Sequence, residues 1–336
     1  MVFDYLHQGF RGLTGLTLVI ASSTLAAPAL AFNLTTPQPL YTTAGDPAAL
    51  RVQPGQGYDG VVRLLLANSL CSGSLLSTGA HILTAAHCLP RSQSGLVDFS
   101  ASVSFTLPSG SVSLGVNQFF LPTEWTGNWE EDAWKGYDLA LLELVDLAPA
   151  AAERYELYRD RDEVGQVADK VGYGRSGAGE TGDTLRAGPK RAGQNRYDVT
   201  GDFFSLGSDR LLLYDFDSGR PENDFFGGDL GLGALEVMAA PGDSGGPSFI
   251  NGRLAGVTSW RLGNLPTDID RVTNSSFGEV GGDVRVSSHL SWIESILQAW
   301  RPPQPPGEPQ SVPEPGVSWV LLGFVGGLLW WRRPRA

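Results

Sequence analysis

The amino-acid sequence predicts an all-β protein, and two observations support this prediction. The chain of 336 residues contains 43 glycines and 22 prolines with a moderate hydrophobic fraction of 42%, a composition typical of many strands joined by turns. Short apolar or alternating runs, bounded by turn residues, recur along the chain, which is the pattern of strands. The length allows one or two domains with a sizeable core.

The predicted strands fall into two groups that show no sequence repeat. The first group consists of residues 60–66, 79–84, 102–105 and 139–142. The second group consists of residues 171–174, 211–214, 247–250, 254–260 and 284–286. Residues 288–297 then place apolar side chains at helical spacing and predict a helix after the last strand.

Residues Gly242 to Pro247, with the sequence Gly-Asp-Ser-Gly-Gly-Pro, are the most informative segment for function. Glycines around Ser244 allow it to stand on a tight turn, where its own N–H and a neighbouring N–H point to one place. A serine nucleophile and an oxyanion hole are built together in this way. On its own, the segment is equally consistent with a surface turn.

Two further segments favour the catalytic interpretation. His87 lies in Thr-Ala-Ala-His-Cys, and Asp138 opens the apolar run Asp-Leu-Ala-Leu-Leu. A serine hydroxyl is a weak nucleophile until an imidazole takes its proton, and the imidazole needs a buried carboxylate that holds the right tautomer. Each residue alone has a simpler interpretation, since a single histidine is usually structural and Asp138 could simply begin a strand. Together the segments supply a triad in the chain order His, Asp, Ser.

These three segments resemble the signature segments of the trypsin-like serine proteases, which have the chymotrypsin fold. The resemblance extends from about residue 52 to residue 300. It implies two six-stranded Greek-key β-barrels, at about 52–150 and about 165–300, with the active site between them and a C-terminal helix. The whole protease domain would span residues 32–300.

The resemblance also assigns a role to each motif residue. His87 would be the general base, Asp138 would orient the imidazole and stabilise the imidazolium, and Ser244 would be the nucleophile. The N–H groups of Gly242 and Ser244 would form the oxyanion hole.

Cys71 and Cys88 are the two cysteines of the chain, and Cys88 follows the motif histidine directly. In the resembled family, such a pair forms a disulfide across the hairpin that carries the catalytic histidine. Export would permit this bond, and reduced, buried thiols are the alternative.

The resemblance further indicates where a substrate would bind. Ser259 and Trp260 match the strand that binds the substrate backbone, and Ser259 would also hydrogen-bond the catalytic aspartate. Met238, six residues before the nucleophile, matches the base of the primary pocket. Without a carboxylate there, we expect a preference for apolar side chains over lysine or arginine. Arg261 stands where the family usually has a small residue and Asp283 is a further candidate for the pocket, so polar or acidic preferences stay open.

The mode of activation has two alternatives. In the resembled family, a freed apolar N-terminus pairs with the aspartate before the nucleophile, here Asp243. Cleavage after Arg51 would free Val52 for this role, but the sequence Val-Gln-Pro-Gly departs from the usual Ile/Val-Val-Gly-Gly. The chain is therefore activated by this cleavage, or it is active as soon as its leader is removed.

An acidic segment at residues 215–224 offers alternating oxygen donors around a glycine. Calcium could bind there through Asp215, Asp217 and Glu222, but the spacing does not complete an EF-hand loop. A solvated acidic loop without a metal or cofactor is the favoured interpretation. No cysteine–histidine cluster in the sequence suggests zinc.

Both ends of the chain carry sorting patterns. Residues 1–31 combine Arg11, an apolar run and a small-x-small cleavage site, which predicts a leader peptide. Signal peptidase would remove it and leave Phe32 as the first residue. An uncleaved membrane anchor is the alternative. Residues 301–311 form a proline-rich linker. Residues 312–336 resemble a PEP-CTERM sorting signal processed by an exosortase, with a permanent tail anchor as the alternative. Either way, we expect an extracellular or cell-surface catalytic domain, anchored to the membrane at least transiently.

The formal net charge of −12 argues against nucleic acid and anionic membrane surfaces as partners, because both would repel the protein. We therefore predict an exported serine endopeptidase that acts on proteins or peptides through an acyl-enzyme and is not specific for lysine or arginine. The alternative from another class is a catalytically silent trypsin-fold module that binds partners at the cell surface.

Overall fold

The computed structural model describes residues 42–66, 69–89, 101–204 and 208–302. The predicted leader, the PEP-CTERM-like tail and nearly all of the predicted linker lie outside these ranges. The described residues up to Ala299 belong to one compact unit, which contains all of the described strands. None of the helices in the described ranges is long and apolar enough to cross a membrane.

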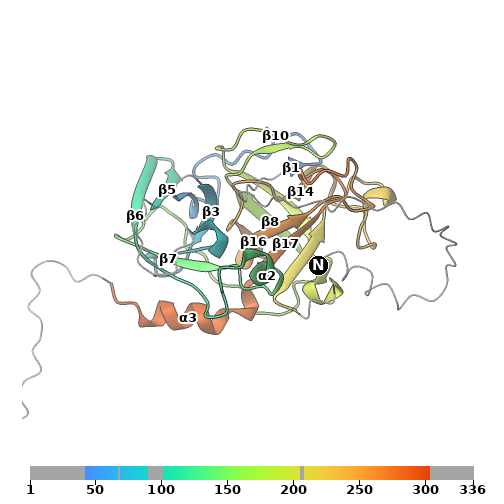
Figure 1. Cartoon of the computed structure of the whole chain (residues 1–336). Helices are drawn as coiled ribbons and strands as arrows, with labels where there is room; N and C mark the ends of the chain where they lie inside the picture. Colours follow the sequence, from blue (N-terminus) through green and yellow to red (C-terminus); the bar gives the residue numbers. More distant parts are fainter. Residues whose placement is uncertain (1–41, 67–68, 90–100, 205–207, 303–336) are drawn as a thin grey trace, which may run out of the picture. The chain divides into compact units, whose positions relative to one another are not determined.

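The first half of the compact unit is a closed six-stranded barrel, seen on the left of Figure 1. Neighbouring strands are antiparallel all the way round. Fully buried apolar side chains, among them Leu64, Ile82 and Phe105, form its core. In hydrogen-bonding order the strands are β2 (Val61–Leu66), β3 (Ser69–Leu75), β4 (His81–Thr84), β7 (Ala140–Leu144), β6 (Gly110–Phe120) and β5 (Ala101–Leu107).

The second half is built on a seven-stranded antiparallel sheet, whose central strands are buried. The predicted all-β fold and its first six-stranded barrel are therefore confirmed. The second half is a half-barrel sheet of seven strands, where a second six-stranded barrel was expected. In hydrogen-bonding order its strands are β11 (Arg191–Arg196), β8 (Val167–Gly172), β15 (Pro247–Ile250), β16 (Arg253–Leu262), β17 (Val280–Arg285), β13 (Leu211–Asp215) and β12 (Val199–Thr200).

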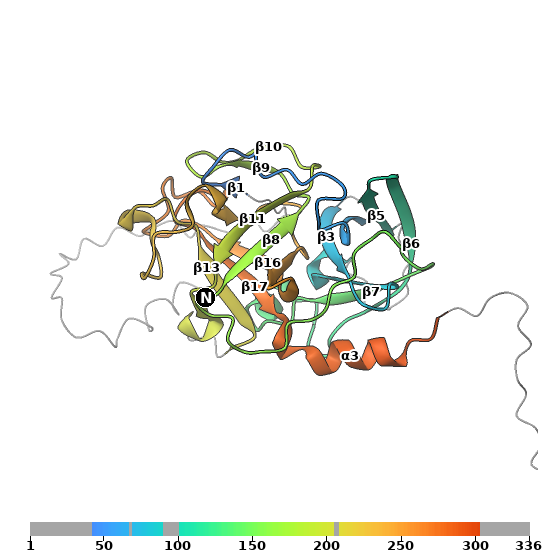
Figure 2. The ribbon, with the colours of Figure 1, turned by 180° about the vertical axis from the view of Figure 1, so that it is seen from behind.

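A small sheet of four short strands completes the second half and includes the first described residues of the chain. Thr42 lies opposite Met238 in an antiparallel pair, and Thr43 pairs in parallel with Ala178. Figure 2 shows β10, β9 and β1 side by side above β11 and β8. In order they are β10 (Gly182–Leu185), β9 (Ser176–Ala178), β1 (Thr42–Thr43) and β14 (Val237–Met238). The chain before residue 52 thus contributes to the second half, although the first barrel follows it in sequence.

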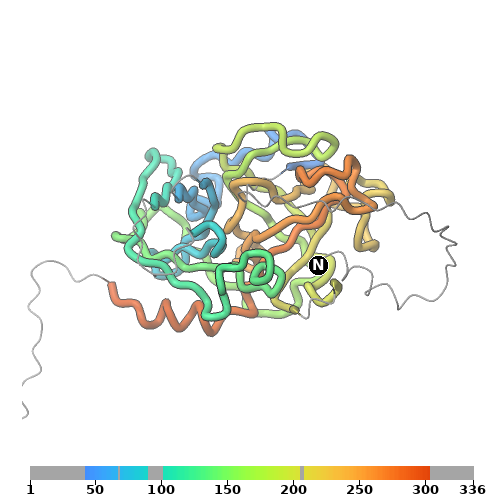
Figure 3. The backbone as a smooth tube through the Cα atoms, viewed as in Figure 1, coloured from blue at the N-terminus to red at the C-terminus, as the bar shows by residue number. Residues whose placement is uncertain are grey.

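Within the residues that the structure describes, two α-helices and several 3₁₀ turns accompany the strands. The helix expected over residues 288–297 is confirmed as α3 (Leu290–Ala299), which buries Ile293 and whose coil is clear in Figure 3. Helix α2 (Trp129–Trp134), between β6 and β7, was not predicted, because six residues are too few to show a helical period. The 3₁₀ turns are η2 (Ala86–Cys88), η3 (Gly201–Phe204), η4 (Pro221–Asn223), η5 (Gly233–Leu235) and η6 (Val286–Ser288).

One buried apolar cluster joins the two halves. Leu83 of β4 and Leu141 of β7 belong to the same cluster as Phe249 of β15 and Val257 of β16. Each of these side chains contributes about 1.5–3 kcal/mol when it is fully buried, so the cluster holds the halves against each other. His87 follows β4, Asp138 precedes β7 and Ser244 precedes β15. The three motif segments therefore enter or leave strands that meet at this cluster.

Candidate active site

His87 and Asp138 are brought together by the pairing of β4 with β7. The two strands are antiparallel, with Thr84 opposite Ala140, so residues just after β4 and just before β7 lie at the same end of the pair. His87 lies there in turn η2, and its backbone N–H donates a hydrogen bond to Asp138 Oδ1 at 2.8 Å. The carboxylate therefore holds the backbone of the turn as well as the ring.

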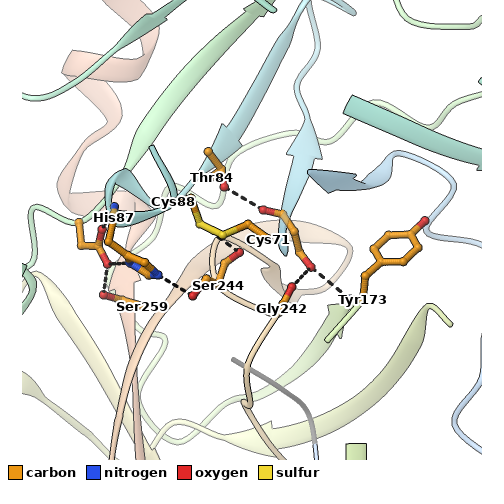
Figure 4. Close-up of a disulfide and its surroundings, with 10 residues drawn as sticks. Cys71, Thr84, His87, Cys88, Tyr173, Gly242, Ser244 and Ser259 are labelled. Atoms are coloured by element: carbon orange, nitrogen blue, oxygen red, sulfur yellow. Dashed lines mark hydrogen bonds and ion pairs between the residues drawn. A yellow bond between two sulfur atoms is a disulfide. The ribbon is translucent and has the colours of Figure 1, made fainter. Parts of the chain in front are cut away.

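The imidazole of His87 bridges Asp138 and Ser244. Its Nδ1 lies 2.6 Å from Asp138 Oδ2, and its Nε2 lies 2.6 Å from Ser244 Oγ, a contact drawn in Figure 4. A carboxylate only accepts hydrogen bonds, so Nδ1 carries the hydrogen and Nε2 presents its lone pair to the serine hydroxyl. The side chain of Asp138 is fully buried and that of His87 is 4% exposed, so little water competes for these contacts.

Asp138 receives a third hydrogen bond from the second half of the fold. The hydroxyl of Ser259, in β16, donates to Asp138 Oδ2 at 2.6 Å. Three donors thus converge on one fully buried carboxylate, which offsets the cost of burying its charge and fixes its orientation. This is the contact between Ser259 and the aspartate that the resemblance implied.

The loop that carries Ser244 depends on two glycines. Gly242 has a φ of 107° and Gly245 a φ of 77°, values that favour glycine. Space is restricted as well, since a Cβ on Gly242 would lie 2.6 Å from Gly174 Cα, and one on Gly245 would lie 2.0 Å from Thr84 Oγ1. The glycines of the motif are therefore required by the turn itself.

Ser72 of β3 braces this loop from the first barrel. Its backbone N–H donates to the carbonyl of Ser244 at 2.8 Å, and its hydroxyl donates to the carbonyl of Gly242 at 2.7 Å. The Ser72 hydroxyl oxygen also accepts the N–H of Tyr173 at 3.1 Å. Sequence reasoning missed this residue. Its position directly after Cys71 was the available signal, because the disulfide brings that part of β3 close to the histidine turn.

The N–H groups of Gly242 and Ser244 have no hydrogen-bond acceptor within the described residues. The N–H groups of Asp243, Gly245 and Gly246 in the same loop are hydrogen-bonded to backbone carbonyls. The N–H groups of Gly242 and Ser244 can therefore donate to a negatively charged oxygen of a bound molecule.

Asp243, between these two donors, is fully buried and bonded to backbone. Its Oδ1 accepts the N–H of Gly174 at 2.9 Å and its Oδ2 that of Ala240 at 3.3 Å. Burial raises the pKa of Asp243 well above its usual range, and the Gly174 hydrogen bond opposes this shift. Val52, the other residue of the predicted activation pair, donates its N–H to the carbonyl of Lys190 at 3.0 Å. In the intact chain, then, other groups satisfy both members of the pair.

The predicted disulfide is confirmed. Cys71 in β3 is bonded to Cys88 in η2, with their Cα atoms 6.3 Å apart (Figure 4). The bond closes a loop between residues 17 positions apart in sequence and ties the turn of His87 to the strand of Ser72.

Two tryptophans of α2 also lie at the site, and the sequence did not predict either contact. The Trp129 ring meets the His87 ring edge-on, with centroids 6.0 Å apart. The Trp134 ring lies 4.2 Å from that of Trp260, the residue after Ser259. Helix α2 therefore covers both the histidine and the beginning of the predicted substrate strand.

The two remaining predicted specificity residues, Met238 and Arg261, both contact other parts of the protein. Met238, in β14, is fully buried and packs in an apolar cluster with Phe277. The guanidinium of Arg261 donates to Ser275 Oγ at 2.6 Å and lies 3.6 Å from a carboxylate oxygen of Asp183. Arg261 thus has polar partners within the protein.

Asp283 does not line a substrate pocket, which corrects the sequence-based suggestion. Its Oδ2 accepts hydrogen bonds from Lys170 Nζ at 2.7 Å and from the hydroxyls of Ser248 and Tyr197, both at 2.5 Å. All of these side chains are buried within the seven-stranded sheet. Burial lowers the pKa of Lys170, and the Asp283 carboxylate opposes that effect. The group is a buried ion pair of the sheet interior.

Of the three suggested calcium ligands, Asp215 and Asp217 come together but Glu222 does not join them. Turn η4 carries Glu222 outward, where it is exposed and lies 4.0 Å from the Arg220 guanidinium. Instead, carboxylate oxygens of Asp215, Asp217 and Asp224 all lie within 4.8 Å of one another. Glu222 lies outside this cluster, because alternation of residues along the sequence does not show where a turn brings the chain back.

Comparison with known proteins gives matches in sequence and in fold. The family model described as Trypsin matches residues 50–276. Two proteins of Corynebacterium glutamicum, both named as peptidases, are similar over 237 residues, one with 30% identity and the other, from strain R, with 28%. The similar region covers 70% of this chain and 66% of each relative, just under two thirds of their length.

A solved structure shows the same arrangement of strands. Neuropsin, a serine protease expressed in the limbic system of mouse brain, matches 74% of this chain and 98% of its own, with a TM-score of 0.54. The two sequences are 18% identical, so this likeness is evidence for the fold.

Proposed function

The chain belongs to the trypsin family, and from that premise we propose that it is a serine endopeptidase that hydrolyses peptide bonds through an acyl-enzyme on Ser244. The observation that carries the proposal is the position of the His87 ring, with one nitrogen 2.6 Å from Ser244 Oγ and the other 2.6 Å from Asp138. This geometry supports catalysis over the alternative of a silent binding module, because binding alone requires neither contact.

The first half of the reaction forms the acyl-enzyme. His87 Nε2 takes the hydroxyl proton of Ser244 as Oγ attacks the carbonyl carbon of the scissile bond. Asp138 stabilises the resulting imidazolium without taking the proton itself. The N–H groups of Gly242 and Ser244 donate to the tetrahedral oxyanion. His87 then gives its proton to the leaving amine, and the carbon–nitrogen bond breaks.

The second half releases the product acid. A water molecule gives a proton to His87 Nε2 and attacks the acyl carbon, and a second oxyanion forms at the same two N–H groups. Collapse of this intermediate breaks the bond to Ser244 Oγ, which regains its proton from His87. The enzyme is then ready for another substrate.

A fluorophosphonate probe tests the proposal directly. Wild-type protein should be labelled, and the Ser244→Ala and His87→Ala variants should not, because the probe needs an activated serine. Peptidase activity should be lost in parallel. If wild type stays unlabelled even after treatment with activating proteases, the silent binding module becomes the better interpretation.

We propose that the enzyme prefers apolar side chains next to the scissile bond. The support is the uncharged residue Met238 at the position that the resemblance assigns to the pocket base, together with an Arg261 guanidinium already engaged by Ser275. A peptide library with all side chains at the position before the cleaved bond tests this. Cleavage confined to lysine and arginine sites would contradict it.

We also propose that the enzyme works outside the inner membrane. The disulfide supports an oxidising compartment. The leader pattern of residues 1–31 and the PEP-CTERM-like pattern of residues 312–336 support processing by signal peptidase and an exosortase. Mass spectrometry of the protein from its native host should find Phe32 at the N-terminus and the tail removed.

A further inference from the structure

Three aspartates near the C-terminal end of β13 converge on one another, and the proposed reaction uses none of them. Oxygen atoms of Asp215, Asp217 and Asp224 all lie within 4.8 Å of one another. Calcium binds oxygen at about 2.3–2.6 Å, so two ligands of one ion can be up to about 5 Å apart. We propose that these three carboxylates form a calcium-binding site.

A second observation at the same place also points to a ligand. Asp217 is 5% exposed, and its Oδ1 has no hydrogen-bond partner among the described residues. A buried, unpaired carboxylate oxygen costs free energy unless a cation or a proton satisfies it. An oxygen of the same carboxylate lies within 4.8 Å of oxygens of the other two aspartates. Calcium can bind both oxygens of one carboxylate, so an ion held among the three aspartates can satisfy Oδ1.

The two neighbouring aspartates are held in place by backbone N–H groups. Asp215 Oδ2 accepts the N–H groups of Phe225 and Phe226 at 2.5 and 3.1 Å. Asp224 Oδ1 accepts the N–H of Gly227 at 2.5 Å. The carboxylates are therefore oriented before a cation arrives, which lowers the ordering cost of binding.

The surroundings add negative charge. The carboxylates of Asp229 and Glu236 also act electrostatically on Asp217. Arg196 pairs with Asp229 at 2.5 Å and compensates one of these charges. An excess of negative charge in a partly buried site favours a divalent cation.

Calcium suits this donor set better than magnesium does. Calcium accepts six to eight oxygen ligands, with carboxylates bound by one or both oxygens, whereas magnesium keeps most of its water and is seldom held by protein carboxylates alone. Asp217 also lines a surface hollow together with Asn223, Ala234 and Phe277, so one of the three proposed ligands borders a space that solvent reaches.

The side chain of Asn195 connects the proposed calcium site to the segment that precedes the loop of Ser244. The side-chain amide of Asn195 donates to the carbonyl of Asp215 at 2.8 Å and to that of Val237 in β14 at 3.0 Å. Val237 lies seven residues before Ser244. Calcium binding should therefore stabilise the second half of the fold up to this segment.

Thermal unfolding of the full-length chain tests the proposal. The measurement is made in the Ser244→Ala background, so that autolysis does not contribute and the outcome is independent of peptidase activity. With calcium at about 100 times its Kd, the midpoint should rise by about 5–10 °C relative to protein treated with EGTA. The same concentration of magnesium should give a much smaller shift.

Two variants localise the effect. Asp217→Asn removes one charge at nearly constant volume, so it should be at least as heat-stable as the parent in EGTA but should gain nothing from calcium. Glu222→Gln, in the same loop but outside the cluster, is the matched control and should keep the full shift. If Asp217→Asn does not fold, Asp224→Asn takes its place. The proposal is overturned by a parent without a calcium shift, by an equal shift with magnesium, or by a full calcium shift in the aspartate variants.

Discussion

The backbone N–H of Ser72 donates to the backbone carbonyl of Ser244 at 2.8 Å, so the first barrel directly holds the loop that carries the proposed nucleophile. The Ser72 hydroxyl adds a bond to the carbonyl of Gly242 at 2.7 Å. Both contacts cross from one half of the fold to the other. The two N–H groups proposed as the oxyanion hole therefore depend on a residue outside the three motif segments.

Replacing Ser72 with alanine should impair both stability and catalysis. The change leaves the N–H of Tyr173 and the carbonyl of Gly242 without their partner, which costs about 1–3 kcal/mol for buried groups. We expect kcat to fall about tenfold, which corresponds to about 1.4 kcal/mol of lost transition-state stabilisation, with KM nearly unchanged. Denaturant unfolding and steady-state kinetics measure the two effects.

A matched control for Ser72→Ala lies in the same barrel. Ser104, in β5, shares a hydrogen bond of 2.8 Å with Ser113, and its side chain makes no hydrogen bond to the loop of Ser244 within the described residues. Ser104→Ala should lose some stability and keep its kcat. Equal kcat values for the two variants would mean that Ser72 has no part in positioning the oxyanion hole.

Asp138→Asn should lower kcat by on the order of 10⁴ with little change in KM. The asparagine amide can donate a hydrogen bond to Nδ1 of His87, which a carboxylate cannot do. The ring then favours the tautomer with its hydrogen on Nε2, and Nε2 can no longer take the proton of Ser244. Asp146→Asn, an exposed change a few residues away, is the control. An Asp138→Asn variant with more than a tenth of wild-type kcat would show that the contact is not catalytic.

Removing the disulfide should destabilise the protein without abolishing the fold. A closed loop of this length is worth about 3 kcal/mol, so the Cys71→Ala/Cys88→Ala variant should unfold about 6–12 °C below wild type. Calorimetry measures the difference. A reducing agent should lower the wild-type midpoint by a similar amount and leave the variant unchanged; a shift in the variant would point to another cause.

His289 should make stability depend on pH on the acid side. Burial lowers its pKa to about 4, and its neutral ring donates from Nε2 to the carbonyl of Gly136 at 2.8 Å. In the unfolded chain a histidine has a pKa of about 6.5, so the unfolded state binds more protons between pH 6.5 and 4. The contribution of His289 to stability is complete above pH 6.5 and is lost as the pH falls through this window.

Because other groups titrate in the same range, the test compares two proteins. The stability difference between wild type and His289→Gln should shrink by up to about 3 kcal/mol from pH 7 to pH 4, since glutamine does not titrate. Denaturant unfolding at several pH values measures this difference. Parallel pH profiles would contradict the expectation.

Arg51→Gln should remain active. In the intact chain Val52 N–H already binds the carbonyl of Lys190, and Asp243 is satisfied by the N–H groups of Gly174 and Ala240, so a freed N-terminus is not needed to hold the loop. Fluorophosphonate labelling compares the variant with wild type. Labelling of wild type alone, with its chain cut after Arg51, would instead establish activation by cleavage.

The sequence predicted those features that depend on local pattern. The run at 247–250 coincides with β15, and the run at 60–66 overlaps β2 almost completely, because short alternating or apolar runs bounded by turn residues are typical of strands. The tight turn at Ser244 could also be predicted from the sequence, because such a turn requires glycine at fixed positions near the serine. The segments of His87 and Asp138 could be recognised before their contact was known because they resemble signature segments of the trypsin-like serine proteases.

Features that depend on contacts between distant segments could not be predicted. Ser72 looks like any serine of a strand until its partners at residues 242 and 244 are known. Asp224 replaces Glu222 in the acidic cluster because a 3₁₀ turn reverses the chain between Asp217 and Asp224. Trp129 reaches the His87 ring from a helix too short to have a period.

Strand β1 has a practical consequence for recombinant work. It lies between β9 and β14 in the small sheet and has only two residues. The family match covers residues 50–276, so β1 lies before the matched residues, and β17 and α3 lie after them. A protein shortened to residues 50–276 would lack β1, which pairs with β9 and β14, and β17, which pairs with β13 and β16. The N–H and C=O groups at these strand edges would then be unpaired, and unpaired strand edges promote aggregation. Expression boundaries should therefore begin before Thr42 and end beyond Ala299.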